Sequence, residues 1–195
     1  MNDRTCKLER KSRETQIEVS IKLDGAGDAA VTTGIGFLDH LLCAIARHSG
    51  IDFQLRCTGD LEIDDHHTAE DCALALGSAI DNALGERKGF ARFGYAYAPL
   101  DESLARAVID FSGRPFAAIS LDLRRDAVGG LACENITHVL SSLATAMRAT
   151  LHVDVLRGEN DHHRAEAAFK AIALALRQAI ARTSDSSVPS TKGVL

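Results

Sequence analysis

Apolar residues fall at every second position over residues 14–23, which predicts a strand with one buried face. The Asp- and Gly-rich run 24–28 predicts a turn, after which residues 29–33 return as a second strand. Alternation resumes over residues 51–57 and predicts a third strand. Further strands are expected in the second part of the chain, at residues 93–97, 103–111, 116–123 and 151–156.

A helical spacing of apolar residues marks four other stretches. The predicted helices cover residues 37–49, a run from about 66 to 84, residues 135–150, and a run from about 162 to 182. Gly50 and Gly85 follow the first two and suit helix C-termini. Strands mixed with helices in this order predict an α+β fold, in which mixed sheets carry helices on one face.

The order strand, helix, strand, helix occurs twice, with an extra strand or so in the second copy. The pair His66–His67 recurs 96 positions later as His162–His163, and the upstream helical histidine His40 recurs 98 positions later as His138. Two features with nearly one period indicate duplication of a half of about 95 residues. We therefore expect one domain of two repeats related by a pseudo-twofold axis, at about 6–90 and 91–185, and a C-terminal tail at 186–195.

Each histidine pair stands in an Asp-His-His-x-x-Glu motif at the start of a predicted helix. Neighbouring imidazoles on a helix point about 100° apart, so a single ion does not easily accept both, whereas two adjacent ions can. The candidate ligands are eight residues, His40, His66, His67, Glu70, His138, His162, His163 and Glu166. Shared between two octahedral ions, four ligands each leave about two positions open.

This ligand set is rich in nitrogen and has no thiolate, which fits manganese, iron or zinc in an open, working site. The alternative is that each motif only begins a helix, with Asp65 or Asp161 as the cap and exposed histidines. For one copy the two interpretations are comparable. Two copies, each with a matching upstream histidine, favour the metal site.

Composition narrows the class of protein further. The 195 residues are 46% hydrophobic and 25% charged, as in soluble globular proteins, and the net charge of -5 gives no reason to expect nucleic acid or acidic lipid as a partner. No apolar run approaches a membrane span, and the N-terminus has no signal-peptide core. The five cysteines form no CxxC, which predicts free thiols in the cytoplasm. Gly34 and Gly36 form no GxGxxG, so no nucleotide is expected.

The sequence resembles the imidazoleglycerol-phosphate dehydratases. The residues that carry the resemblance lie at 13–15, 37–40, 59–71, 84–89, 99–102, 112–115, 160–170 and 189–195. The resemblance implies duplicated half-domains like ribosomal protein S5 domain 2, and a homo-oligomer of 24 subunits with active sites at subunit interfaces. It also implies a lyase of histidine biosynthesis that dehydrates D-erythro-imidazole glycerol phosphate to imidazole acetol phosphate. No phosphatase segment precedes the domain, so we expect the single-function form.

The resemblance also assigns roles to residues. The eight candidate ligands would hold two Mn2+ per active site, which bind the substrate imidazolate. Glu14 would be the general acid/base and would reach the metals of a neighbouring subunit, with Asp101 and Glu102 as further candidates. The expected phosphate-binding residues are Arg92, Arg114, Lys170, Ser190 and Lys192. His48, one or two turns past His40 on the same predicted helix, is a further substrate-binding candidate by its position, or else a core or hydrogen-bonding histidine. The chain departs from the family around His138, where Thr137 and Val139 replace an acidic residue and an aromatic one.

Two other functions remain open from the sequence. A dinuclear metallohydrolase would use similar ions, although such sites usually depend on bridging carboxylates, and this set contains two acids. A non-catalytic metal-binding or storage protein would need neither Glu14 nor the phosphate-binding cations.

Overall fold

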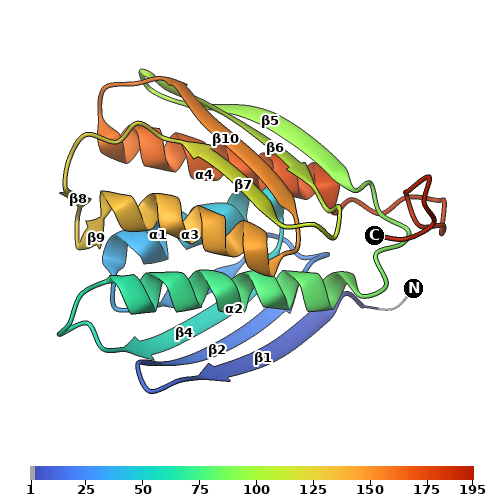
Figure 1. Ribbon diagram of the computed structural model, residues 1–195, viewed down its shortest axis with the longest axis horizontal. Coiled ribbons are helices and arrows are strands. Elements are labelled where there is room, and N and C mark those ends of the chain that lie inside the picture. Colours follow the sequence, from blue (N-terminus) through green and yellow to red (C-terminus); the bar gives the residue numbers. More distant parts are fainter. Residues whose placement is uncertain (1–2) are drawn as a thin grey trace.

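The computed structural model describes residues 3–195, and it has four layers, with a sheet on each outer side and two layers of helices between them (Figure 1). The first sheet contains β1 (Thr5–Lys11), β2 (Thr15–Lys22), β3 (Ala29–Thr32) and β4 (Asp52–Gly59). The second contains β5 (Phe93–Leu100), β6 (Ser103–Asp110), β7 (Phe116–Ser120) and β10 (Thr150–Arg157). The helices are α1 (Gly36–Ser49), α2 (His66–Leu84), α3 (Cys133–Ala146) and α4 (Asp161–Ala179). A small hairpin, β8 (Ala127–Val128) and β9 (Leu131–Ala132), precedes α3.

The two sheets have the same topology. Their strand orders are β1-β2-β4-β3 and β5-β6-β10-β7, and each has one parallel pair, β3 with β4 and β7 with β10. Each sheet has two helices on its inner face (Figure 1). The predicted α+β fold with duplicated half-domains is confirmed.

The second half does have additional strands, β8 and β9, but they form a separate hairpin and the two main sheets have four strands each. The sheets match because β1, at residues 5–11, is a strand that was not predicted from the sequence. It is an edge strand on which Cys6 and Leu8 are only partly buried and the other positions are mostly exposed, so its alternation is weak. The hairpin β8–β9 was also missed, because strands of two residues leave no periodic signal.

The second predicted strand does not return beside the first. β4 lies between β2 and β3, so the turn at residues 24–28 is not part of a β-hairpin ladder. Its backbone is held from β4 instead, because one carboxylate oxygen of Asp52 accepts hydrogen bonds from the backbone N–H groups of Ala26, Gly27 and Asp28 at 2.7–2.9 Å.

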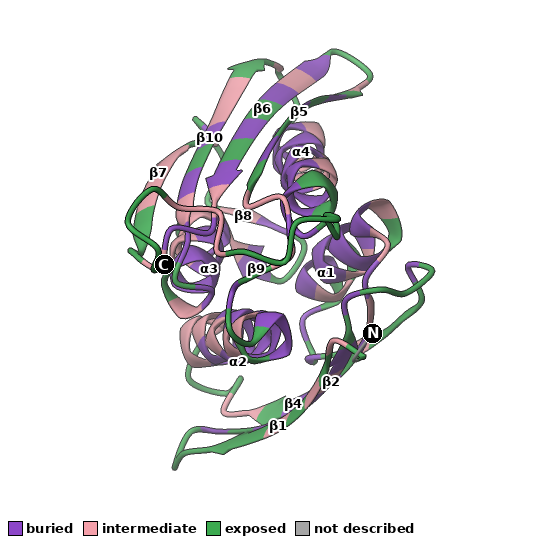
Figure 2. Ribbon diagram, turned by 90° about the vertical axis from the view of Figure 1, so that its right-hand side faces the viewer, coloured by how far each residue is buried: buried purple, intermediate pink, exposed green. Residues whose placement is uncertain are grey.

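The core lies between the sheets, where the helices of the two halves pack against each other (Figure 2). α2 packs on α3 and α1 packs on α4, so each helix pair joins the two halves. A Cβ on Gly77 of α2 would lie 2.7 Å from the Cβ of Ala146 on α3, which means that this close approach requires glycine. The starts of α2 and α4 therefore face helices from the other half.

A buried arginine also ties the halves together. Arg87, in the connection after α2, is 2% exposed and pairs with Asp81. Its guanidinium donates to the backbone carbonyls of Phe111, Met147 and Arg148 in the second half at 2.7–3.2 Å.

No helix within residues 3–195 is both long and apolar enough to cross a membrane.

Candidate metal centres

The first cluster consists of His66, Glu70 and His138. His66 and Glu70 share a face at the start of α2 because they are four residues apart, and His138 comes from α3. Nε2 of His138 lies 3.1 Å from Oε1 of Glu70, and Nε2 of His66 lies 3.7 Å from Oε2 of the same carboxylate. The two imidazole rings are stacked, with centroids 4.9 Å apart.

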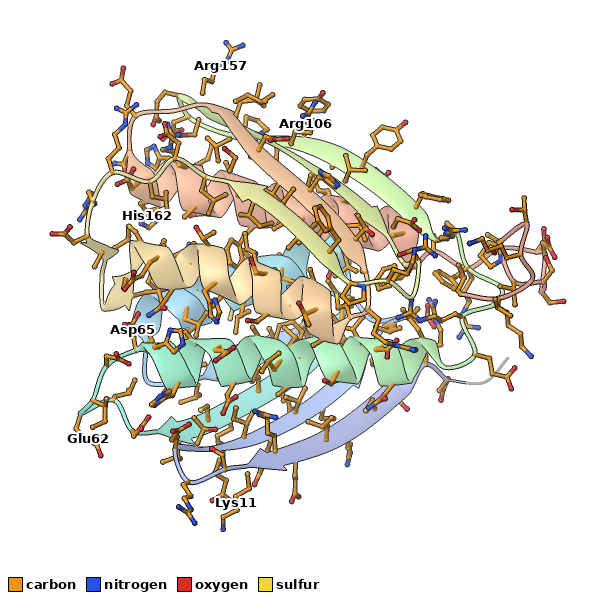
Figure 3. All side chains as sticks on the ribbon, viewed as in Figure 1. Lys11, Glu62, Asp65, Arg106, Arg157 and His162 are labelled. Carbon is orange, nitrogen blue, oxygen red and sulfur yellow. The ribbon has the colours of Figure 1, made fainter. Side chains whose placement is uncertain are left out.

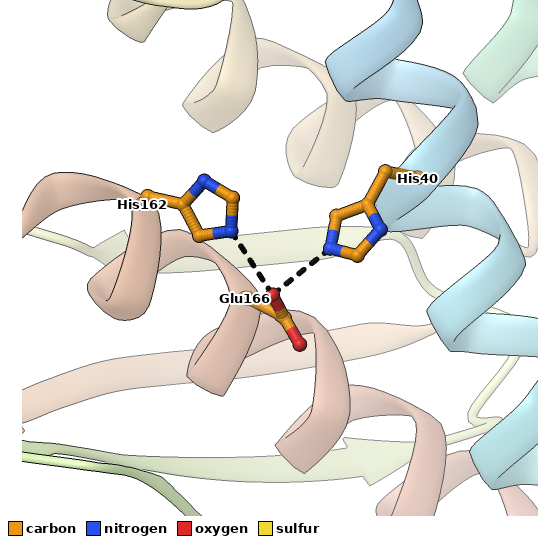
Figure 4. Close-up of side chains that lie close together, drawn as sticks. All are labelled: His40, His162 and Glu166. Carbon is orange, nitrogen blue, oxygen red and sulfur yellow. Dashed lines mark hydrogen bonds and ion pairs between the residues drawn. The ribbon is translucent and has the colours of Figure 1, made fainter.

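The second cluster consists of His40, His162 and Glu166 and has the same design (Figure 4). Oε2 of Glu166 lies 2.9 Å from Nε2 of His40 on α1 and 3.2 Å from Nε2 of His162. The other oxygen, Oε1, lies 2.6 Å from Nζ of Lys170, one turn further along α4. Burial raises the pKa of Glu166, but the hydrogen bonds from Lys170 and His40 outweigh it and lower the pKa to about 2.

Each cluster takes one histidine from one half of the chain and a histidine with a glutamate from the other. In each cluster the donor atoms lie within 4.8 Å of one another, a spacing suited to a shared cation. Nε2 of His138 is buried and makes no hydrogen bond despite its proximity to Glu70. Because a buried nitrogen that makes no hydrogen bond is costly, and its lone pair can bind a cation, these residues fit a divalent metal ion.

His67 and His163 belong to neither cluster. Nδ1 of His67 donates to Asp60 at 3.0 Å, and Nδ1 of His163 donates to Glu102 at 2.7 Å. These hydrogen bonds are the main cause of the raised pKa of both histidines. An imidazole whose Nδ1–H is held by a carboxylate presents the lone pair of Nε2, which is the usual arrangement of a histidine that binds metal. Both histidines therefore keep Nε2 as their outer nitrogen, outside the two clusters of the chain.

A second carboxylate faces the outer nitrogen of each of these histidines. Oε1 of Glu14, in the turn before β2, lies 3.7 Å from Nε2 of His67, and Oδ2 of Asp101, in the turn before β6, lies 3.8 Å from Nε2 of His163. The Glu14 side chain is 51% exposed. Glu14 and Asp101 thus occupy similar places in the two halves, next to a nitrogen that is oriented for a metal.

Glu102 has a different environment from Glu14. Its Oε1 accepts hydrogen bonds from the backbone N–H groups of Asn160 and Glu159, and its Oε2 accepts from His163. The backbone hydrogen bond from Asn160 is the largest cause of a pKa far below the usual range of a glutamate. Glu102 therefore remains a carboxylate that orients His163.

The six predicted substrate-binding residues do not lie together. Lys170 pairs with Glu166 of the second cluster, and His48, at the end of α1, has a pKa lowered by burial and by the charge of Lys170. The other four are at the C-terminal end of α4, namely Arg92, Arg114, Ser190 and Lys192. There the backbone N–H of Arg92 donates to the carbonyl of Ala179, the last residue of α4.

The tail packs at this same end. A guanidinium nitrogen of Arg92 donates to the carbonyl of Pro189 at 2.7 Å, which places Ser190 nearby. The end of the chain lies against Gly113, since a Cβ there would be 2.6 Å from the carbonyl carbon of Leu195. His162 lies near the start of α4, at the opposite end of the molecule (Figures 1 and 3). Seventeen residues of helix separate His162 from Ala179, which is about 25 Å.

Two groups that orient the candidate ligands were not predicted from the sequence. Asp60 reaches His67 from the loop after β4, and Asn135 on α3 accepts a hydrogen bond from Nδ1 of His66 at 2.9 Å. The seven-residue loop spacing of Asp60 carries no periodic signal. Asn135 is a buried polar residue three positions before His138, on a helix that was predicted, so its place beside a candidate ligand was a usable signal.

The chain is similar to known proteins over most of its length. Residues 33–176 match the family model of imidazoleglycerol-phosphate dehydratase. A dehydratase of this name from Phaffia rhodozyma is 55% identical over 197 residues, covering 98% of this chain and 96% of that protein. One from Phytophthora nicotianae is 57% identical over 192 residues, and the chain spans 42% of that relative. The crystal structure of the Pyrococcus furiosus enzyme has a TM-score of 0.82 and 38% identity, covering 96% of this chain and 100% of that one.

Proposed function

Because the chain belongs to the imidazoleglycerol-phosphate dehydratase family, whose members are hydro-lyases of histidine biosynthesis, we propose that it removes water from D-erythro-imidazole glycerol phosphate at a site with two manganese ions. The product would be imidazole acetol phosphate. The observation that carries the proposal is the pair of crossed clusters, each with two imidazole nitrogens and one carboxylate within 4.8 Å.

Six of the eight candidate ligands make up these clusters, and His67 and His163 would complete the set. Three protein donors in each cluster leave an octahedral ion open to a further histidine and to substrate. Two bound ions would stabilise the substrate ring as an imidazolate, because cations lower the pKa of a coordinated N–H group. The nitrogen and oxygen donors without thiolate suit manganese.

Glu14 would be the acid/base group that transfers a proton during dehydration. Its carboxylate lies 3.7 Å from Nε2 of His67, so it stands beside the position that a metal-bound ring would take. It is half exposed and no arginine or lysine within residues 3–195 pairs with it, so its carboxylate is free to exchange a proton. Asp101 has the similar place beside His163.

The phosphate group would be held by cations and by the tail. Arg92, Arg114, Ser190 and Lys192 offer guanidinium, hydroxyl and ammonium donors, which suit a phosphate. They lie beyond the far end of α4, which is about 20 Å along the helix from Glu166 and about 25 Å from His162 of the second cluster, and this is longer than a substrate of this size. One substrate molecule would therefore contact the metal end of one chain and the tail of another.

This division supports a homo-oligomer, for which we propose 24 subunits with active sites at the interfaces. The outer face of β5 exposes large aromatic side chains, with Phe93, Tyr95 and Tyr97 all more than half exposed. Apolar patches of this kind are usually covered by another protein surface. The five free cysteines accord with a reducing compartment, and we propose the cytoplasm.

The decisive test is an assay of purified protein with added manganese. We expect steady-state dehydration of imidazole glycerol phosphate and no hydrolysis of simple phosphoesters. Phosphoester hydrolysis without dehydration would instead identify a dinuclear metallohydrolase. Metal binding without either reaction would indicate a storage protein.

A further inference from the structure

The two clusters have different neighbours at equivalent positions. Asn135 and Phe37 each precede the helical histidine of their cluster by three residues, and each contacts the first histidine of the opposite pair. Asn135 accepts a hydrogen bond from Nδ1 of His66, whereas the ring of Phe37 lies 4.9 Å from that of His162. Within residues 3–195, Nδ1 of His162 has no hydrogen-bond partner.

The hydrogen bond to Asn135 prepares His66 for a cation. Since the amide oxygen accepts from Nδ1–H, the proton is fixed there and the lone pair is left on Nε2, which points to Glu70. Asn135 is 4% exposed, so little water competes for this bond. His162 is held by packing against Phe37, which does not select one tautomer. Groups that orient a ligand in this way typically change metal affinity 10- to 100-fold.

The two glutamates also differ in whether a lysine competes with a metal ion for the carboxylate. Oε1 of Glu166 is paired with Nζ of Lys170, so a cation in the second cluster meets a carboxylate that is partly neutralised. The position one turn past Glu70 is Leu74. Among the ion pairs within residues 3–195, Glu70 pairs only with His66 and His138, so both of its oxygens face the cluster.

We propose that the two clusters are unequal metal sites, and that the first cluster binds a divalent cation more tightly because Asn135 orients His66 and no lysine competes for Glu70. This inference rests on the proposed metal chemistry. Asn135 is then a positioning residue that acts through His66. The first cluster fills before the second as the concentration of Mn2+ rises.

Single-cluster variants test the order of filling. Glu166→Gln leaves the first cluster intact and Glu70→Gln leaves the second, and free Mn2+ is followed by electron paramagnetic resonance during titration of each protein. We expect at least about tenfold tighter binding in Glu166→Gln. Equal affinities, or tighter binding in Glu70→Gln, overturn the inference. If the unsubstituted chain binds no Mn2+ at all, the proposed metal chemistry fails, and the inference fails with it.

Further substitutions test the cause. In the Glu166→Gln background, Asn135→Leu should weaken Mn2+ binding about 10- to 100-fold. Asn135→Asp keeps an acceptor oxygen for His66, so it should bind Mn2+ about as tightly as the protein with Asn135. In the Glu70→Gln background, Asn135→Leu should leave the affinity unchanged, while Lys170→Met should raise it. An equal loss in both backgrounds, with a lowered unfolding temperature, would show that Asn135 only stabilises the fold.

Discussion

Nε2 of His40 lies 2.9 Å from Oε2 of Glu166, although 126 residues separate them in the chain. The same relation holds for His138 and Glu70 at 3.1 Å, with the halves exchanged. Neither half can assemble a cluster from its own residues. The packing of α1 on α4 and of α2 on α3 is therefore a requirement of the candidate metal sites as well as of the core.

Glu14→Gln should abolish turnover while metal content and assembly stay intact. The amide keeps the size of the side chain but cannot exchange a proton, so we expect a loss of about 100- to 10,000-fold in kcat. Steady-state dehydration and metal analysis check this. Glu9→Gln, an exposed acid on the edge strand β1, is the matched control and should keep full activity. Near-normal activity of Glu14→Gln would remove its proposed role.

Removal of metal should disperse the assembly. If His67 and His163 bind ions held by other chains, each ion links subunits, and a chelator removes the free energy that these links contribute. Light scattering before and after dialysis against a chelator measures the particle size, and added Mn2+ should restore it. A particle of unchanged size would place all ligands of each ion within one chain.

Mixed assemblies test whether the active site is shared. Glu14→Gln chains and Lys192→Met chains should each be inactive, because each lacks one end of the site. After dissociation, mixing in equal amounts and reassembly, about one quarter of the sites would combine an intact Glu14 with an intact tail from another chain. Activity near that fraction of the unsubstituted enzyme is expected. No recovery would mean that one chain supplies both ends.

Arg87→Leu should destabilise the fold strongly. Its loss leaves the carbonyls of Phe111 and Met147 without their buried donor and leaves Asp81 with Arg148 alone, at a cost of about 3 kcal/mol. Urea unfolding measures this free energy. Arg106→Leu removes only an exposed ion pair with Asp154 and should change stability far less than Arg87→Leu. Similar losses for both variants would contradict a tethering role for Arg87.

Low pH should remove the contribution of Asp24 to the free energy of unfolding. Its hydrogen bond from Arg4, together with that from Arg182, lowers the pKa of this carboxyl to about 2 from its ordinary 3.8. A lowered folded-state pKa stabilises the fold above about pH 4, and the contribution disappears as the pH falls toward 2. Asp24 is partly exposed, so the effect is at most about 1 kcal/mol. Asp24→Asn should be less stable than the unsubstituted chain at pH 7, and the difference should vanish near pH 2.

The sequence predicted the elements that carry strong periodicity and missed those that do not. α2 ends at Leu84 as expected from Gly85, and β2 follows the predicted alternation closely. The edge strand β1 was not predicted because its apolar positions are few and only partly buried, so its alternation of polar and apolar residues is weak. The place of β3 was wrong, since local turn residues do not reveal that a later strand inserts between β2 and β3.

The candidate site was predicted as a set of residues but not as an arrangement. The repeat spacing identified His40, His66, His138 and His162, because duplication leaves a period that can be read along the chain. That each cluster combines residues of both halves could not be predicted from the sequence, since it depends on which helices pack together. The tail residues were named through the family resemblance, and their separation from the clusters along α4 emerged only from the fold.

The crossed clusters also bear on how such a chain could arise. An ancestral half-domain on its own would have held half of each cluster, so it could have bound these cations only as a symmetric dimer of two identical copies. In that dimer both metal sites would have been the same by symmetry. Joining two copies in one chain removes that constraint, which allows equivalent positions to differ, as Asn135 differs from Phe37 and Lys170 from Leu74.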